Sequence, residues 1–161
     1  MAHPVYLVLS AAGTEIPGES TGAGPGPANA IECIYFEQAA TTSREYGAGM
    51  ATGRREYRPL VIRKRIDRAS PLLWKALTEG QPIEGSFKFF RSSSEGVTEH
   101  FYTIEIKQAR ISSIREYVPD ILDPATKHEP PLEEINFVFH TSSWTYKEGN
   151  ITYQDTWIAS P

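Results

Sequence analysis

The residue types that most often carry chemistry are few in this sequence. There is one cysteine, Cys33, and there are four histidines, which are His3, His100, His128 and His140. Zinc ligands usually come in close pairs along the chain, and these residues form no such pair. Cys33 lies inside an apolar segment, which indicates a buried thiol. No glycine-rich segment continues into the Lys-Ser/Thr of a phosphate-binding loop. The sequence therefore predicts no metal site and no cofactor.

Nucleophilic and acid–base catalysis also lack an assembled motif. A serine nucleophile in acyl transfer often occupies a Gly-x-Ser-x-Gly turn, and the nearest imitation here is PGEST at 17–21. Glu133 and Glu134 are neighbours in a predicted strand, so they point to opposite faces and cannot act as a pair. We interpret both as residues of a solvated face. A triad assembled from distant residues stays compatible with the sequence, so a β-barrel hydrolase stays open as an alternative.

The densest group of charges is basic. Seven of the sixteen Lys and Arg residues fall between Arg54 and Arg68. Such a run could contact nucleic acid, but the alternation of a strand sends Arg63 and Arg65 to one side and Lys64 to the other, which divides the patch. The net charge of −4 gives no general attraction to nucleic acid or anionic lipid. We therefore predict a solvated or subunit-contacting face and no nucleic-acid partner.

The size and composition of the chain predict one folded domain over residues 1–161. Eight Tyr, seven Phe and three Trp supply large buried areas, and a single cysteine excludes an intramolecular disulfide. No segment approaches the roughly 20 apolar residues that a membrane span requires, so no membrane insertion is expected. The short apolar stretch at the start has no Lys or Arg before it, which argues against a cleaved secretory leader.

Period-two patterns dominate the elements that must position these residues. Strands are expected at 5–9, 30–37, 59–66, 83–91, 99–107, 109–118 and 132–141. One helix is expected over 70–80, with Ser70 as its N-cap, Pro71 in its first turn and Gly80 as a left-handed stop. Its apolar stripe of Leu73, Ala76 and Leu77 suits a helix that covers a barrel end or a sheet face. About eight short strands and one helix predict a mainly β barrel or sandwich.

Two segments interrupt or end this pattern. Residues 38–57 are too polar and glycine-rich for one long strand, and a loop of that length is commonly functional and could reach another subunit. The alternative interpretation of the same residues is a flexible surface hairpin. Residues 144–157 predict a hairpin that reverses at 147–150. Its aromatic residues, Trp144, Tyr146, Tyr153 and Trp157, share one face with Ile151, and Thr152, Gln154 and Thr156 share the other.

Several motifs taken together resemble a known family. They are IDxxSPLLxKAL at 66–77, LEEI at 132–135 and WTYKEGNI at 144–151. With the opening strand, they are similar to the haemolysin-coregulated protein (Hcp) family, the tube subunit of the bacterial type VI secretion system. The resemblance covers nearly the whole chain. It implies a mainly β fold, a compact β-barrel of two packed antiparallel sheets with one short α-helix and a long extended loop.

The resemblance also implies a function and its partners. Six copies would form a ring with a wide channel, and rings would stack into a tube that holds effectors. The tube would be assembled in the cytoplasm inside a contractile sheath, tipped by a VgrG-type spike and exported. This is a structural function and needs neither catalysis nor a cofactor. In the long loop, the expected subunit contacts are Arg44, Tyr46, Met50, Arg54 and Arg55, because arginine and aromatic residues are favoured in interfaces. A small-ligand-binding barrel of the lipocalin kind is a further alternative, although bulky inward aromatics argue against an interior cavity.

Overall fold

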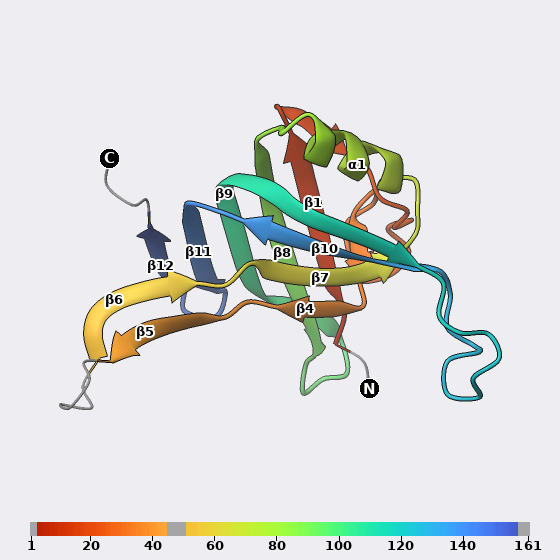
Figure 1. Ribbon diagram of the computed structural model, residues 1–161. Helices are drawn as coiled ribbons and strands as arrows, with labels where there is room; N and C mark the ends of the chain where they lie inside the picture. Colours follow the sequence, from red (N-terminus) through yellow and green to blue (C-terminus); the bar gives the residue numbers. More distant parts are fainter. Residues whose placement is uncertain (1–2, 45–50, 158–161) are drawn as a thin grey trace.

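The computed structural model describes residues 3–44 and 51–157, and within these the chain is almost entirely strand (Figure 1). The one helix of the described residues is α1 (Ser70–Thr78). The strands are β1 (Val5–Ala11), β2 (Thr14–Ile16), β3 (Ile31–Cys33), β4 (Tyr35–Glu37), β5 (Ala40–Arg44), β6 (Ala51–Tyr57), β7 (Leu60–Arg65), β8 (Ile83–Ser92), β9 (Thr98–Tyr117), β10 (Leu132–Val138), β11 (Thr141–Tyr146) and β12 (Ile151–Thr156).

The strands form two packed antiparallel sheets that share β9. In the wide sheet, β1 lies between β8 and the short strands β2 and β3, and β9 continues through β11 to β12 at the other edge. The narrow sheet has the order β9-β10-β7-β4, and β5 pairs with β6 separately. The predicted mainly β class is confirmed. The barrel is replaced by two curved sheets that do not close on each other, because β12 and β4 pair on one side only among the described residues.

The core lies between the two sheets and follows the predicted alternation. Leu7 of β1, Phe87 of β8 and Ile106 of β9 face Ile62 of β7 and Phe137 of β10, and all five are fully buried. Phe87 and Phe137 meet edge to face across the two sheets with ring centroids 6.2 Å apart. Burying each such side chain contributes about 1.5–3 kcal/mol. The space that a ligand-binding barrel would keep open is thus occupied by packed side chains.

The two sheets are connected by strands that change partner. Residues 30–37, expected as one strand, form β3 on β1 and β4 on β7, with the half-exposed Ile34 at the corner. Residues 99–107 and 109–118, expected as two strands, form the single bent strand β9. Its first half pairs with β8 and β11 and its second half with β10. The bend lies at Gln108, whose φ of 51° falls in the left-handed region.

Helix α1 covers one end of the sheets, as its narrow apolar stripe predicted (Figure 1). Leu73 and Ala76 are buried, and Leu77 packs against the core. Gly80 has the predicted positive φ, 59°, just beyond the last turn. The predicted cap is wrong: the N-cap position is Ala69, and Ser70 is a buried residue inside the helix. The Asp67 carboxylate instead accepts a 2.9 Å hydrogen bond from the Ala69 backbone N–H.

Two segments project from opposite sides of the packed sheets (Figure 1). One is the β5–β6 hairpin, called the arm below, which continues from β4 and leads into β7. This pairing agrees with the interpretation of residues 38–57 as a surface hairpin and corrects the expectation of an irregular loop. The other is the loop at 118–131, between β9 and β10. Both projections are available for contacts outside the chain.

Candidate functional surfaces

The predicted contact residues are distributed along the arm. Arg44 ends β5, where it pairs with Ala51, while Arg54 and Arg55 belong to β6. Tyr46 and Met50 lie outside the described residues. The structure therefore brings three of the five candidates onto one hairpin. Their contact with another subunit stays a prediction.

Arg55 is already engaged inside the chain. Its guanidinium holds Asp155 of β12 in a two-pronged pair, in which Nε donates to Oδ2 at 2.5 Å and Nη2 donates to Oδ1 at 2.8 Å. The hydroxyl of Tyr57 donates to Oδ2 of the same carboxylate at 2.6 Å. Arg55, Tyr57 and Asp155 are called the clasp below. The clasp fastens the base of the arm to the last strand of the wide sheet.

The clasp changes the protonation behaviour of its members. The bonded guanidinium of Arg55 lowers the pKa of Asp155, with a further contribution from the Tyr57 hydroxyl. Burial, and next the hydrogen bond to Asp155, raise the pKa of Tyr57 to about 12. At neutral pH, Asp155 is therefore an anion and Tyr57 a neutral donor, which is the arrangement that the hydrogen bonds require.

Aromatic rings extend the clasp into the 144–157 hairpin. The hairpin itself is confirmed, with positive φ at Gly149 and Asn150 in the turn. Tyr57 stacks on Trp144, and Trp144 stacks on Tyr153 at a centroid distance of 6.1 Å. Trp144 also donates to Gln38, at the start of the arm, at 2.9 Å. The aromatic face of this hairpin is thus the surface on which the arm base rests.

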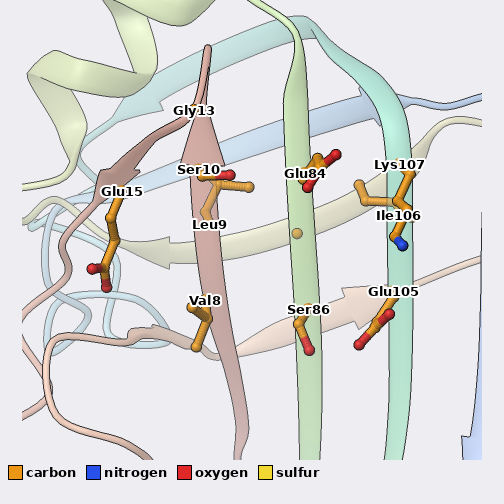
Figure 2. A pocket seen from close by; sticks show the side chains of 11 residues that line it. Val8, Leu9, Ser10, Gly13, Glu15, Glu84, Ser86, Glu105, Ile106 and Lys107 are labelled. Atoms are coloured by element: carbon orange, nitrogen blue, oxygen red, sulfur yellow. The ribbon is translucent and has the colours of Figure 1, made fainter.

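The opposite face of the wide sheet is polar and shallowly hollowed (Figure 2). Ser10 of β1, Glu84 and Ser86 of β8, and Glu105 and Lys107 of β9 point from three neighbouring strands into one depression. The residues lining it include no histidine or cysteine, so its serines have no such base beside them.

Threonine and serine continue this face toward the far edge. Thr103, Thr145 and Thr152 lie side by side on β9, β11 and β12, and the last two share a 3.1 Å hydroxyl hydrogen bond. This confirms that Thr152 points away from the aromatic residues. We call the side of the wide sheet that faces away from the core the hydroxyl face. Short hydroxyl and mixed charged groups of this kind suit contact with water rather than a dry interface.

One ionic group lies where the sequence predicted solvent. Glu133 is fully buried, contrary to the solvated-face interpretation, and so is Lys64, whose ammonium lies 2.5 Å from Glu133 Oε1. Lys64 also donates to Asp67 at 2.7 Å, and the Ser70 hydroxyl donates to Glu133 at 2.7 Å. Burial raises the pKa of Glu133, opposed by Lys64 and Ser70. We call these four residues the buried ionic cluster. It ties β7, β10 and the start of α1 together.

Neither this cluster nor the thiol is available to a substrate. Lys64 and Glu133 are inaccessible to water, and burial raises the pKa of Cys33 to about 12, which leaves it an unreactive thiol. Across the described ranges, no group of three or more His, Cys, Asp or Glu side chains is arranged to hold a metal ion. In the same ranges no helix combines the length and hydrophobicity needed to cross a membrane.

Sequence reasoning missed the clasp, although part of its signal was present. Asp155 occupies the same alternate positions as Ile151 and Tyr153, so the period of the strand places its carboxylate on the aromatic face. Its partner Arg55 is 100 residues away along the chain. No local pattern connects the two.

Comparison with known proteins identifies the family. The family model described as "Type VI secretion system effector, Hcp" matches residues 6–146. The "Major exported protein" of Pseudomonas aeruginosa (strain PAO1) is 33% identical over 123 residues, which cover 76% of this chain and 72% of that protein.

Solved structures agree in fold. A mutant form of the Hcp1 protein from E. coli EAEC 042 is 27% identical, with a TM-score of 0.84 and coverage of 98% of this chain and 100% of that one. The secreted protein Hcp3 from Pseudomonas aeruginosa is 24% identical, with a TM-score of 0.75 and the same coverage of both chains. The chain therefore belongs to the Hcp family of the type VI secretion system, a family of structural tube proteins rather than enzymes.

Proposed function

We propose that six copies of this chain close into a ring and that the rings stack into the inner tube of a type VI secretion system. The observation that carries this proposal is the arm, which projects from the body of the molecule while its base is fastened by the clasp (Figure 1). A hairpin held in this way makes few contacts with its own chain and is positioned to contact another copy. Membership of the Hcp family supports the same assembly.

The hydroxyl face is the candidate wall of the channel. Its threonine and serine side chains are short, and Glu84, Glu105 and Lys107 mix both signs of charge. A wall of this composition would stay hydrated and would hold cargo weakly, which suits effectors that must be carried and later released. The aromatic side of the same sheet would then face the neighbouring subunits and the core.

The remaining partners follow from the position of such a tube. It would be assembled in the cytoplasm within a contractile sheath, carry a VgrG-type spike at its tip and be exported with its effectors. One of the relatives is itself a "Major exported protein", which supports export of this chain as well.

The assembly is tested by measuring mass in solution and imaging the purified protein. A species of six times the chain mass of 18.0 kDa, together with rings in electron micrographs, is the expected result. A protein that stays monomeric over a wide range of concentrations would refute the proposal.

Substitution in the arm tests its part in assembly. The double variant Arg54→Glu and Arg55→Glu should weaken assembly, but Arg55 also holds Asp155, so the single variant Arg54→Glu separates contact between subunits from damage to the clasp. Loss of one interface arginine should raise the concentration needed for half-assembly by about tenfold. Arg110→Glu, on the exposed side of β9, is the matched control and should assemble normally. If Arg54→Glu also assembles normally, Arg54 does not contribute to the contact.

A further inference from the structure

The most exposed large hydrophobic side chains of the described residues gather at two places. Leu122, Ile121 and Val118 are 87%, 67% and 64% exposed in the loop between β9 and β10, and Ile151 and Tyr153 are 67% and 66% exposed on β12. We call the first group the knob. The second group continues into the half-buried Trp144 and Tyr146, and these four residues are called the shelf. Apolar groups gathered in this way usually mark an interaction site.

The knob keeps its shape through its own hydrogen bonds. The Asp120 carboxylate accepts from the Leu122 backbone N–H at 2.8 Å, and the Asp123 carboxylate accepts from the Ala125 N–H at 2.9 Å. The Thr126 hydroxyl donates to the Asp120 carbonyl at 2.7 Å, which closes the loop. Leu122 is therefore presented on a formed turn, and binding would require little ordering of this segment.

The shelf exists because the wide sheet extends beyond the narrow one. Tyr153 pairs with Trp144, and Ile151 pairs with Tyr146, on the side of the sheet that faces the core. The arm base covers this side at Asp155 and Trp144 and leaves Ile151 and Tyr153 open. In the described part of the chain, β12 pairs only with β11, so no strand covers its outer edge, and Arg55 bonds that strand only at the Thr156 carbonyl near its end. An exposed apolar edge strand favours association with another chain.

We propose that the knob of one copy of this chain docks on the shelf of the next copy. The two surfaces lie on opposite sides of the molecule, since the loop at 118–131 and strand β12 are far apart in Figure 1. A contact between two different surfaces of identical subunits is heterologous, and such contacts close into a ring when the rotation between successive copies closes and otherwise build a filament. This inference rests on the proposed ring and names the surfaces that build it.

The chemistry of the two surfaces is complementary. Aliphatic Leu122 and Ile121 would lie against the exposed side of Tyr153, which removes apolar groups of both copies from water. The knob carries two carboxylates, Asp120 and Asp123, and the turn beside the shelf carries Lys147. Glu148 shares that turn, so apolar contact dominates and charge adds a smaller term. A symmetric contact between two shelves would bury the apolar residues of the shelf but would leave those of the knob exposed to water.

Cysteine cross-linking tests this contact directly. The natural Cys33 is buried. In the double variant Leu122→Cys and Tyr153→Cys, the two introduced thiols are therefore the accessible ones among the described residues. After mild oxidation of the assembled protein, we expect a ladder of covalent species up to six chains, which disappears under reducing conditions. Each single variant should give no ladder. Val97→Cys with Tyr153→Cys is the matched control, because Val97 is 62% exposed but belongs to neither surface.

The outcomes separate this inference from the proposed function. Rings that form without a ladder overturn the knob and shelf contact and leave the ring in place. Dimers formed by Tyr153→Cys alone show a shelf-to-shelf contact and also overturn it. If the unmodified protein forms no rings, the proposed function itself fails.

Charge substitution gives a second test that does not depend on disulfide geometry. Leu122→Asp should raise the concentration needed for half-assembly by more than about tenfold, because a carboxylate would be placed against aromatic rings. Val97→Asp should leave it unchanged. Far-ultraviolet circular dichroism should show the same fold in both variants. Normal assembly of Leu122→Asp would overturn the inference.

Discussion

The chain uses cation–carboxylate contacts in two regions that differ mainly in their access to water. In the buried ionic cluster, Lys64 and Glu133 are fully buried between the sheets and the start of α1. In the clasp, the side chain of Arg55 is 43% exposed while it holds Asp155. When a buried ion pair is broken, water cannot solvate the charge that is left behind, whereas water does solvate it when the pair lies at the surface. The buried ionic cluster therefore stabilises the fold, and the clasp sets the position of the arm.

The largest effect is expected from removing one partner of the buried pair. Lys64→Ala leaves Glu133 without its cation in a place that water does not reach, and such changes cost about 3–5 kcal/mol. Urea unfolding of the variant should show this loss in the free energy of unfolding. A loss below about 1 kcal/mol would place the buried pair in the same class as a surface pair.

A double substitution sharpens this prediction. Lys64→Met with Glu133→Leu removes both charges and keeps similar volumes, and replacing a buried ion pair by apolar residues is often neutral or stabilising. The double variant should recover most of the stability that Lys64→Ala loses, measured again by urea unfolding. Ser70 and Asp67 each lose a partner in this variant, which limits the recovery. A double variant as unstable as Lys64→Ala would show that the cluster is required as a whole.

An intermediate effect is expected from Asp155→Asn in the clasp. The substitution removes the charge that Arg55 holds, and the loss of stability should be smaller than for Lys64→Ala, because the guanidinium is half in water. The main change should be faster amide hydrogen exchange in β5 and β6 and weaker assembly. Exchange rates in β8 and β10 provide the internal control and should not change. Unchanged exchange in the arm would mean that the clasp does not hold it.

The pH dependence of the same variant has a definite sign. The folded-state pKa of Asp155 is lowered, so the stability it contributes is fully present above its ordinary pKa of 3.8 and is lost as the pH falls through the lowered value. The difference in melting temperature between the wild type and Asp155→Asn should therefore be constant from about pH 5 to 7 and shrink below pH 3.8. A difference that persists at the lowest pH would exclude the charge of Asp155 as its cause.

The smallest effect is expected from Tyr57→Phe. This variant keeps the ring against Trp144 and removes only the hydroxyl that donates to the Asp155 carboxylate, and a hydrogen bond to a charged group at a partly exposed site is worth about 1.5 kcal/mol. Because the pKa of Tyr57 is raised to about 12 from 10.0, the advantage of the wild type should be present below pH 10 and lost as the pH rises from 10 to 12. Thermal unfolding of both proteins across this range measures it. Parallel curves for the two proteins would contradict the raised pKa.

Elements with a strong local period could be predicted from the sequence. The hairpin at 144–157 and the helix after residue 70 were found because one buried face or stripe repeats along a single segment. The exchange of partners at Ile34 and at Gln108 could not be found in this way. At these two positions the apolar and polar residues continue to alternate, but the chain passes from one sheet to the other. Which sheet it joins depends on strands that are distant in sequence.

The charged residues show the same limit more clearly. Glu133 was interpreted as solvated from its position beside Glu134 in a strand, but its partners Lys64 and Ser70 offset the cost of burying its carboxylate. Ser70, which bonds it, is 63 residues away along the chain. Arg55 lies on the arm, and its engagement with Asp155 was not predicted. Residue type and spacing indicated which elements carry the charges, and the tertiary pairing decided which charges are free.

The shared strand β9 has a consequence for the mechanical stability of the subunit. Because residues 98–107 complete one sheet and residues 110–117 complete the other, neither sheet can be stripped away without dismantling both. We therefore expect the subunit to unfold cooperatively in one step under mechanical force, rather than strand by strand. In the proposed tube, which would be pushed out of the cell under force, a subunit that unfolds only as a whole would be protected against partial unfolding.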